Sequence, residues 1–287
     1  MPTYNFKQEA EVYVVSGGTH RIHVTDISFS QTFSEESYSV NTIHSPTNLF
    51  EASVINKANV ASFSFSAPAL KESDYAILET LLINATEFEL YIKTAADIYH
   101  LDKAVLTNGS FVIERSRPLS LQIAGEAAQL ERGVSFTGTL PISDKSYTIP
   151  VLDIELNSSS LTDIVSVTME LQNEVSWTGY TTVNKAVSAT TMYPSGFTIS
   201  KKILAGSITQ YLTDGNSSTV QTFDTDASLS IKAGNGLSGS FFRGFSFGPA
   251  TCSFTNRVRT SQVFFQSYDW RLVQNTNLAN ILNYATD

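Results

Sequence analysis

The sequence predicts a mainly β protein made of two tandem domains, each a small β-barrel or β-sandwich flanked by a short helix. Three observations predict this class. Alternating apolar and polar residues recur along the whole chain, helical periodicity is confined to one segment, and the strand pattern of the first half returns in the second. With 287 residues, the chain is long enough for two domains that each bury a core.

The first half opens with short strands around a glycine turn. The strand pattern of Glu11–Val15 ends at a Gly-Gly turn signal, and residues 21–24 resume the pattern. Residues 26–31 then alternate between apolar and polar, which predicts a further strand. Residues 32–48 are polar and without a clear period, so we expect either a long loop or an extended hairpin, and such segments usually have a role.

One helix is predicted in the first half, over residues 72–83. Tyr75, Leu78 and Leu82 fall on one stripe of this segment, as expected when a helix packs one face on a core. Acidic residues at its start interact favourably with the helix dipole, and Asn84 is a residue at which the helix can end.

The second half begins after the turn-rich residues 143–145. We place the boundary at about Asp144, which gives domains at 1–144 and 145–287. Residues 165–171 alternate cleanly and residues 261–273 give another long strand pattern. The counterpart of the first-half helix, residues 214–224, contains glycine, asparagine and serines, so at most one or two turns of helix are expected there.

The two halves share a pattern and an order of strands, although residue identity between them is low. Residues 63–66 lead to 88–92 in the first half, and residues 197–200 lead to 228–231 in the second. Each half closes on alternating strands, at 110–114 and at 252–255. Because two linked modules can occupy two equivalent positions in a ring, this pattern favours an assembly component over an enzyme.

Composition bounds the function further. The chain is 42% hydrophobic and only 16% charged, with a net charge of −9 and no basic cluster, which argues against a protein that grips nucleic acid. The single cysteine, Cys252, lies in an alternating strand and reads as a small core residue. We expect no signal peptide, no membrane span and assembly in a cytoplasm.

Two glycine motifs suggest chemistry but fit strands better. Residues 234–239 match the spacing of a dinucleotide-binding loop, yet a strand pattern follows where that loop needs a helix, so a hairpin turn is favoured. Residues 244–248 match the spacing of a hydrolase nucleophile elbow around Ser246. All four histidines precede Ser246 and a strand follows it, so a β-strand with glycine ends is favoured.

Metal and acid–base constellations are weak in this sequence. His20 and His23 would face opposite sides of a strand, and His44 and His100 offer no obvious third ligand, so no metal and no cofactor are expected. The acidic pairs Glu35 with Glu36 and Asp224 with Asp226 have the composition of a glycoside hydrolase site. Their polar surroundings favour solvated loops, and no catalytic residue is assigned.

Aromatic residues leave one alternative open. Five of them could form a platform for sugars in a receptor- or carbohydrate-binding tail-tip or fibre domain, although alternating aromatics usually belong to a core: Tyr4, Tyr13, Phe29, Phe33 and Tyr38.

The pattern of strands resembles the tail tube proteins of long-tailed bacteriophages, most of all the subclass with two fused tube domains in one chain. Residues 146–151 are similar to the strand that opens a tube domain, and residues 195–199 to an inner strand of the same unit, which residues 205–214 follow. Residues 25–29 and 62–65 fit the same pattern in the first half. The segment after Asp214 departs from the family, which has a fuller helix there.

The resemblance implies a structural subunit without enzymatic activity. Three copies would form a homotrimeric ring with six quasi-equivalent positions, and rings would stack into a hollow tube for genome ejection. Implied partners are further copies of the chain, tape-measure and tail terminator or tip proteins, and double-stranded DNA in transit without specific binding. The segment at 32–48 is the candidate ring-stacking loop, with these residues: Thr32, Glu35, Glu36, Tyr38, His44 and Asn48.

Overall fold

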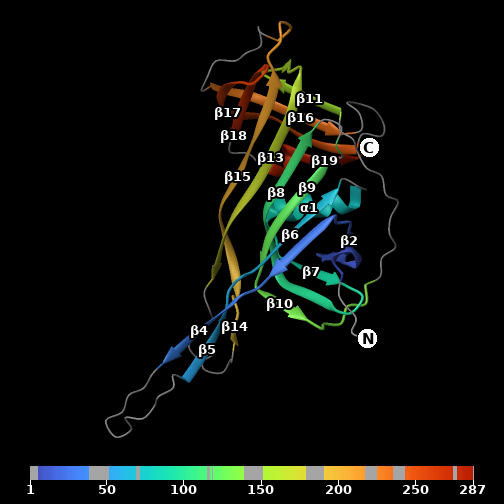
Figure 1. Ribbon diagram of the computed structural model, residues 1–287, viewed down its shortest axis with the longest axis vertical. Helices are drawn as coiled ribbons and strands as arrows, with labels where there is room; N and C mark the ends of the chain where they lie inside the picture. The colour runs from blue at the N-terminus through green and yellow to red at the C-terminus, as the bar shows by residue number, and fades with distance from the viewer. Residues whose placement is uncertain are drawn as a thin grey trace.

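The computed structural model describes residues 6–38, 52–68, 72–114, 117, 119–138, 151–178, 191–216, 225–234, 243–273 and 277–286 (Figure 1). The first half of the chain contains η1 (Lys7–Glu9), β1 (Glu11–Val15), β2 (Thr19–Ile22), β3 (Asp26–Ser30), β4 (Phe33–Tyr38), β5 (Ala52–Ala58), β6 (Ala61–Pro68), α1 (Glu72–Asn84), β7 (Phe88–Lys93), β8 (Ile98–Glu114), β9 (Ser120–Ala127) and β10 (Gln129–Arg132). The second half contains β11 (Val151–Leu156), β12 (Ser159–Ser160), β13 (Ile164–Thr178), β14 (Thr191–Met192), β15 (Gly196–Tyr211), β16 (Thr225–Gly234), β17 (Arg243–Thr260), β18 (Phe264–Leu272), η3 (Leu278–Asn280) and β19 (Leu282–Thr286). The prediction of a mainly β protein is confirmed.

One sheet runs through both halves. Its strands pair in the order β3-β6-β9-β8-β13-β15-β18-β17, and we call this layer the spanning sheet. The halves join in it where β8 pairs antiparallel with β13. In the described part of the chain β3 and β17 do not pair with each other, so the sheet is open rather than closed into a barrel, and the sandwich alternative holds.

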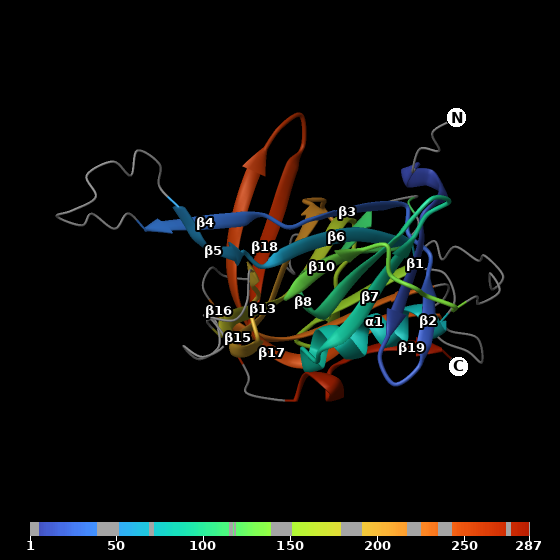
Figure 2. The same cartoon turned by 90° about the horizontal axis from the view of Figure 1, so that it is seen from below.

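Two further groups of strands form the second layer of the sandwich. β2, β1 and β7 continue from the first part of β8, and β12, β11 and β16 continue from the first part of β17. Figure 2 shows α1, β1, β2, β7 and β19 gathered on one side of the body, away from β3 and β6. Apolar side chains therefore fill the space between the two layers.

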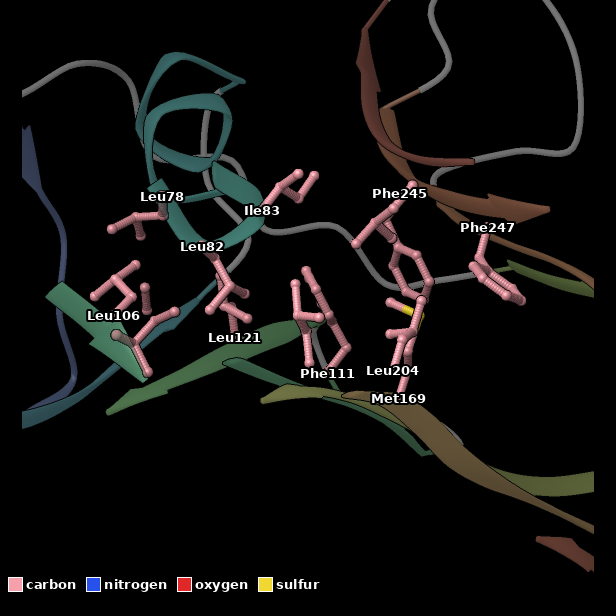
Figure 3. Close-up of a cluster of buried hydrophobic side chains, with 14 of the residues drawn as sticks. Leu78, Leu82, Ile83, Leu106, Phe111, Leu121, Met169, Leu204, Phe245 and Phe247 are labelled. Carbon is pink, nitrogen blue, oxygen red and sulfur yellow. The ribbon is translucent and has the colours of Figure 1, made fainter. Parts of the chain in front are cut away.

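The core between the layers is continuous from one half to the other (Figure 3). Leu78, Leu82 and Ile83 of α1 point toward strands of both halves. Phe111 of β8 lies in the middle of the cluster, and its ring stacks on that of Phe245 with centroids 4.7 Å apart. Each fully buried side chain of this size contributes about 1.5–3 kcal/mol relative to exposure, so the halves stabilise one another.

Strand pairing follows the same scheme in the two halves. Each half has an N-terminal hairpin (β1–β2 and β11–β12) whose first strand pairs with the strand after the helix position (β7 and β16). Five further strand pairs of the first half have a counterpart in the second. In the spanning sheet, β3–β6 corresponds to β13–β15, β6–β9 to β15–β18, and β8–β9 to β17–β18. In addition, β7–β8 corresponds to β16–β17, and β8–β10 to β17–β19.

A close aromatic–glycine contact occurs at corresponding places in these two ladders. Phe63 of β6 lies opposite Gly125 of β9, where a Cβ would come within 2.2 Å of the Phe63 ring. Gly206 of β15 lies opposite Trp270 of β18, where a Cβ would come within 2.9 Å of the indole. The aromatic side chain belongs to the earlier strand, β6, in the first half and to the later strand, β18, in the second half. The two contacts give the residues at which the two ladders can be aligned.

The polar segment predicted as a loop or hairpin forms a hairpin arm in its described part. β4 pairs antiparallel with β5, and β14 of the second half pairs parallel with β5 through Thr191 and Asn56. Figure 1 shows this three-stranded arm extending away from the body at the far end of β13 and β15. The arm therefore contains strands from both halves.

Some element boundaries lie where the sequence predicts them and others are shifted. The β1–β2 hairpin and the helix appear where they were predicted, and α1 ends at Asn84, before Ala85 with a φ of 52°. The strand predicted over 261–273 begins later, at Phe264, because Ser261 N donates to the Val263 carbonyl in a turn between β17 and β18. Of residues 214–224, the first three form a turn and 217–224 lie outside the described residues, as does the boundary near Asp144.

Candidate assembly surfaces

The outer face of the spanning sheet is mostly polar, although a few outward positions are apolar or aromatic, namely Val112, Ile203 and the neighbouring Tyr211 and Phe265. Alternation along each strand places apolar residues toward the core and small polar residues outward. The outward positions include Asp26, Ser28 and Ser30 of β3; Ser62, Ser64 and Ser66 of β6; Gln122 and Glu126 of β9; Asn108 and Ser110 of β8; Thr168, Glu170 and Gln172 of β13; Ser207 and Thr209 of β15; and Ser267, Asp269 and Arg271 of β18. We call this surface the polar face.

The polar face continues across the junction of the halves, where Val112 is an apolar outward residue opposite Thr168. A shallow hollow on it is lined by residues of both halves, among them Ser64, Ser110 and Glu170. Hydroxyl groups bond to one another across strands, as between Thr168 Oγ1 and Ser207 Oγ at 2.8 Å. This surface is therefore a single hydroxyl- and amide-rich sheet face, with no deep cleft among its described residues that would enclose a small substrate.

Charge on the polar face is sparse and mixed, with carboxylates in slight excess. The negative charges belong to Asp26, Glu114, Glu126, Glu170, Glu174 and Asp269, and the cations are Lys201 of β15, Arg271 of β18 and Arg257 and Arg259 of β17. Arg257 forms an ion pair with Asp269 on the neighbouring strand, so part of its charge is compensated. The cations therefore do not form a continuous row along this face.

The joint between β8 and β13 shows how one half covers the other. Phe111 lies directly opposite Met169, and their exposed fractions are only 4% and 1%. On the polar side of the same joint, Asn108 Nδ2 donates to Glu170 Oε1. This joint thus combines a ladder of main-chain hydrogen bonds, an apolar inner side and a polar outer side.

Apolar side chains are exposed at the end of the β17–β18 hairpin. Val258 is 48% exposed, Val263 51% and Phe264 58%. Figure 2 shows this hairpin projecting from the body. Phe33, at the base of the β4–β5 arm, is also 57% exposed and has an edge contact with the Tyr193 ring at 6.5 Å.

The candidate ring-stacking residues lie partly in the arm. Thr32 precedes β4, and its hydroxyl oxygen accepts a bond from Asn59 Nδ2 at 2.8 Å, which ties the base of the arm to the body. The remaining candidates lie on β4 or beyond it: Glu35, Glu36 and Tyr38 are in β4, opposite Asn56, Ile55 and Ala52 of β5, while His44 and Asn48 lie outside the described residues. Their role in stacking stays a prediction.

The glycine motifs lie where a β-protein places them. β16 ends at Gly234 and pairs antiparallel with β17, so residues 235–242, which lie outside the described residues, connect two neighbouring antiparallel strands. Ser246 lies within β17, opposite Lys232 of β16, as the strand interpretation predicts. Cys252 is fully buried, as predicted, and burial raises the pKa of its thiol to about 12.

The structure gives His100 neighbours that sequence spacing did not reveal. Ligand-type atoms of Glu89, His100 and Asp102 lie within 4.8 Å of one another, and His100 Nδ1 is 2.9 Å from Glu131 Oε2. β7 and β10 flank the first part of β8 and bring these side chains together. The Tyr91 ring stacks on His100 at 4.3 Å, and its hydroxyl donates to Glu89.

These hydrogen bonds and the ring contact give Glu89 and His100 a structural role, because each of the two side chains has a protein partner. Burial, and then the hydrogen bond to Glu89, raises the pKa of Tyr91 to about 12, so its hydroxyl remains a donor at neutral pH. His20 and His23 belong to no ligand cluster within the described residues. The acidic pairs do not converge either: Asp226 is exposed on β16, Asp224 lies outside the described residues, and Glu35 and Glu36 are consecutive in β4.

The aromatic platform of the alternative interpretation is not assembled by the described residues. Tyr13 is 1% exposed, Phe29 is half-buried against Tyr99, and Phe33 is exposed. Tyr4 lies outside the described residues, and of Tyr38 only the place in β4 is described. No helix among the described residues has the length and apolar character needed to cross a membrane.

The described residues form a β-sandwich with one extended polar face, projecting arms and strand edges that they leave unpaired, as is typical of β-rich structural subunits. The chain matches the family described as the Bacteriophage Baseplate Tube Protein Family over residues 69–285, and it therefore belongs to that family. It is a structural, tube-like component of the bacteriophage tail, as the resemblance implied at this coarser level. No curated protein matches the chain.

Proposed function

We propose that the protein is a tube subunit whose three copies form a ring with six quasi-equivalent positions, and that rings of this kind continue a hollow conduit for double-stranded DNA. The observation that carries this proposal is the repeated pairing scheme of the two halves, joined edge to edge at β8 and β13. Two equivalent units, residues 1–144 and 145–287, would then occupy neighbouring positions in one ring.

The polar face supports the assignment of the conduit surface. A protein that holds DNA neutralises phosphates with rows of Lys and Arg and releases counterions. The polar face instead carries mostly hydroxyl and amide groups, with interspersed Asp, Glu and Arg side chains. In the proposed ring this face lines the lumen, so DNA passes without adhering.

The arms support a direction for stacking. The β4–β5–β14 arm contains strands of both halves and extends from one end of the body (Figure 1). In the proposed tube it reaches the next ring, with Thr32, Glu35, Glu36, Tyr38, His44 and Asn48 in or beyond it. Further proposed partners are tape-measure and tail terminator or tip proteins, and assembly takes place in the host cytoplasm.

Electron microscopy of the concentrated, purified protein tests the proposal. We expect negatively stained particles to be rings or short hollow tubes, and sedimentation to show an oligomer of three chains or its multiples. A protein that stays monomeric at every concentration would refute the ring. An isolated monomer that binds defined glycans would favour the receptor-binding alternative instead.

A further inference from the structure

The joint between the halves has a counterpart on each side of the molecule, and the described residues leave both counterparts unpaired. One edge of β8 is occupied first by β7 and then, over residues 108–114, by β13. The corresponding edge of β17 is occupied by β16 only as far as Phe254. Within the described residues, the remainder of β17 pairs with β18 alone.

The other side of the molecule offers the counterpart of β13. β3 and β13 occupy corresponding places in the two halves. β3 pairs with the first strand of the β6–β9 pair, and β13 pairs with the first strand of the β15–β18 pair. β13 has β15 on one edge and β8 on the other. In the described part of the chain β3 pairs only with β6, so its second edge carries unpaired main-chain donors and acceptors.

The ladders of the two halves fix the register of the missing contact. The aromatic–glycine pairs make Phe63 the counterpart of Gly206. Phe63 lies opposite Phe29 and Gly206 opposite Met169, so Phe29 corresponds to Met169. The residues two positions before Gly125 and Trp270 lie opposite Gly109 of β8 and Asn256 of β17, so these two residues correspond. Two positions further along each strand, Phe111 of β8 therefore corresponds to Val258 of β17.

From this correspondence we infer that the end of β17 pairs antiparallel with β3 of the neighbouring copy, with Val258 opposite Phe29 and Arg259 opposite Ser28. The inference rests on the proposed ring and names the strands that close it. The occupant of the β17 edge that the described residues leave unpaired is a second copy of the same chain, in the geometry that β8 and β13 already show within one chain.

Burial and charge agree with this pairing. Phe111 is 4% exposed beneath the second half, whereas its counterpart Val258 is 48% exposed in the single chain. Phe29 is only partly buried, beside the Tyr99 ring at 5.0 Å, and its contact with Val258 would cover both. On the outer side Arg259 would lie diagonal to Asp26, a favourable pair of opposite charges.

Cysteine cross-linking tests the register directly. Ser28 and Arg259 are both exposed, so neither Ser28→Cys nor Arg259→Cys disturbs the core. Opposite residues in an antiparallel pair have Cα atoms about 4.5–5.5 Å apart, within the range that a disulfide spans. The matched control combines Arg259→Cys with Ser64→Cys, because Ser64 is exposed and lies opposite Ser28 one strand further in, about 10 Å from the partner.

The two single variants are mixed before oxidation, so that a cross-link can form only between different chains. We expect covalent dimers from the Ser28→Cys and Arg259→Cys mixture, at least tenfold more than from either variant alone or from the Ser64→Cys control. The double variant should give covalent closed rings. These bands must disappear on reduction.

The outcomes separate this inference from the proposed function. Rings or tubes in electron micrographs without the cross-link would overturn the β17–β3 register and leave the tube proposal standing. Monomers alone would overturn both. As a second measurement, Val258→Asp should abolish ring formation while the circular dichroism spectrum is retained, whereas Val273→Asp, at an equally exposed site after β18, should assemble normally; assembly of Val258→Asp at the wild-type concentration would contradict the pairing.

Discussion

The side chain of Asn173 in the second half binds the carbonyl of Leu82 at the end of α1 in the first half, with a donor–acceptor distance of 2.8 Å. The same Nδ2 group donates to the Leu106 carbonyl at 3.0 Å, and Asn173 is only 4% exposed. Lys202 Nζ donates to the next carbonyl of the helix, that of Ile83. The last carbonyls of a helix lack partners within it, so the second half completes a helix of the first.

Replacing Asn173 should therefore uncouple the halves. Asn173→Leu removes a donor from two carbonyls, and a buried polar group left without a partner costs about 1–3 kcal/mol. We expect the free energy of unfolding, measured by urea denaturation, to fall by about 2–4 kcal/mol. The neighbouring exposed Gln172→Leu is the control and should change it by less than about 0.5 kcal/mol.

Gly206 should not tolerate a side chain. A Cβ at this position would lie 2.0 Å from the Thr168 carbonyl oxygen and 2.9 Å from the Trp270 ring, and neither the strand nor the buried ring can retreat. We expect Gly206→Ala to lower the unfolding free energy by about 1–3 kcal/mol or more. Gly196→Ala, on the same strand, meets only Thr178 Oγ1 at 3.6 Å, so an equal loss there would contradict this account.

Deleting residues 37–48 should separate ring formation from tube growth. The deletion removes the end of β4 and the residues directly after it, and it leaves β3 and the paired residues of the β8–β13 joint in place. We expect an unchanged circular dichroism spectrum and sedimentation of small species, single rings at most. Tubes of normal length would refute the stacking role of this segment.

Cys252 should be protected from thiol reagents until the protein unfolds. Burial raises its pKa from 9.0 to about 12, so the reactive thiolate is nearly absent at pH 8. The neutral thiol favours the folded state; this contribution is complete below pH 9 and is lost as the pH rises from there toward 12. Labelling with a chromogenic disulfide at pH 8 should be slow in buffer and rapid in urea, and rapid labelling of the folded protein would contradict the buried position.

Strands and the helix could be predicted from the sequence because the alternation of a strand and the apolar stripe of a helix depend only on residues that are close in the chain. The strands around Gly17 and the helix ending at Asn84 are examples. Contacts between distant strands leave no such local signal. Three contacts depend on the register between distant strands, which cannot be derived from one sequence. They are the pairing of β8 with β13, the contact of Glu89 with His100 and the parallel pairing of β14 with β5.

The prediction of the ring-stacking residues rests on a polar segment without a clear period, which is typical of functional segments. The hairpin alternative explains the described part, since β4 pairs with β5 along its whole length. The polar face, in contrast, was present in the sequence as serine at every second position of several strands. Its extent became visible only once strands of both halves were placed in one sheet.

The opposite placement of the aromatic–glycine pairs makes the halves non-interchangeable. Phe63 needs the space above Gly125, and Trp270 needs the space above Gly206. Exchange of β6 for β15 by recombination would set Phe63 against Trp270 in one half and leave two glycines facing an empty space in the other. Each half is thus specific for its own partner strands, even though the two halves share one pairing scheme.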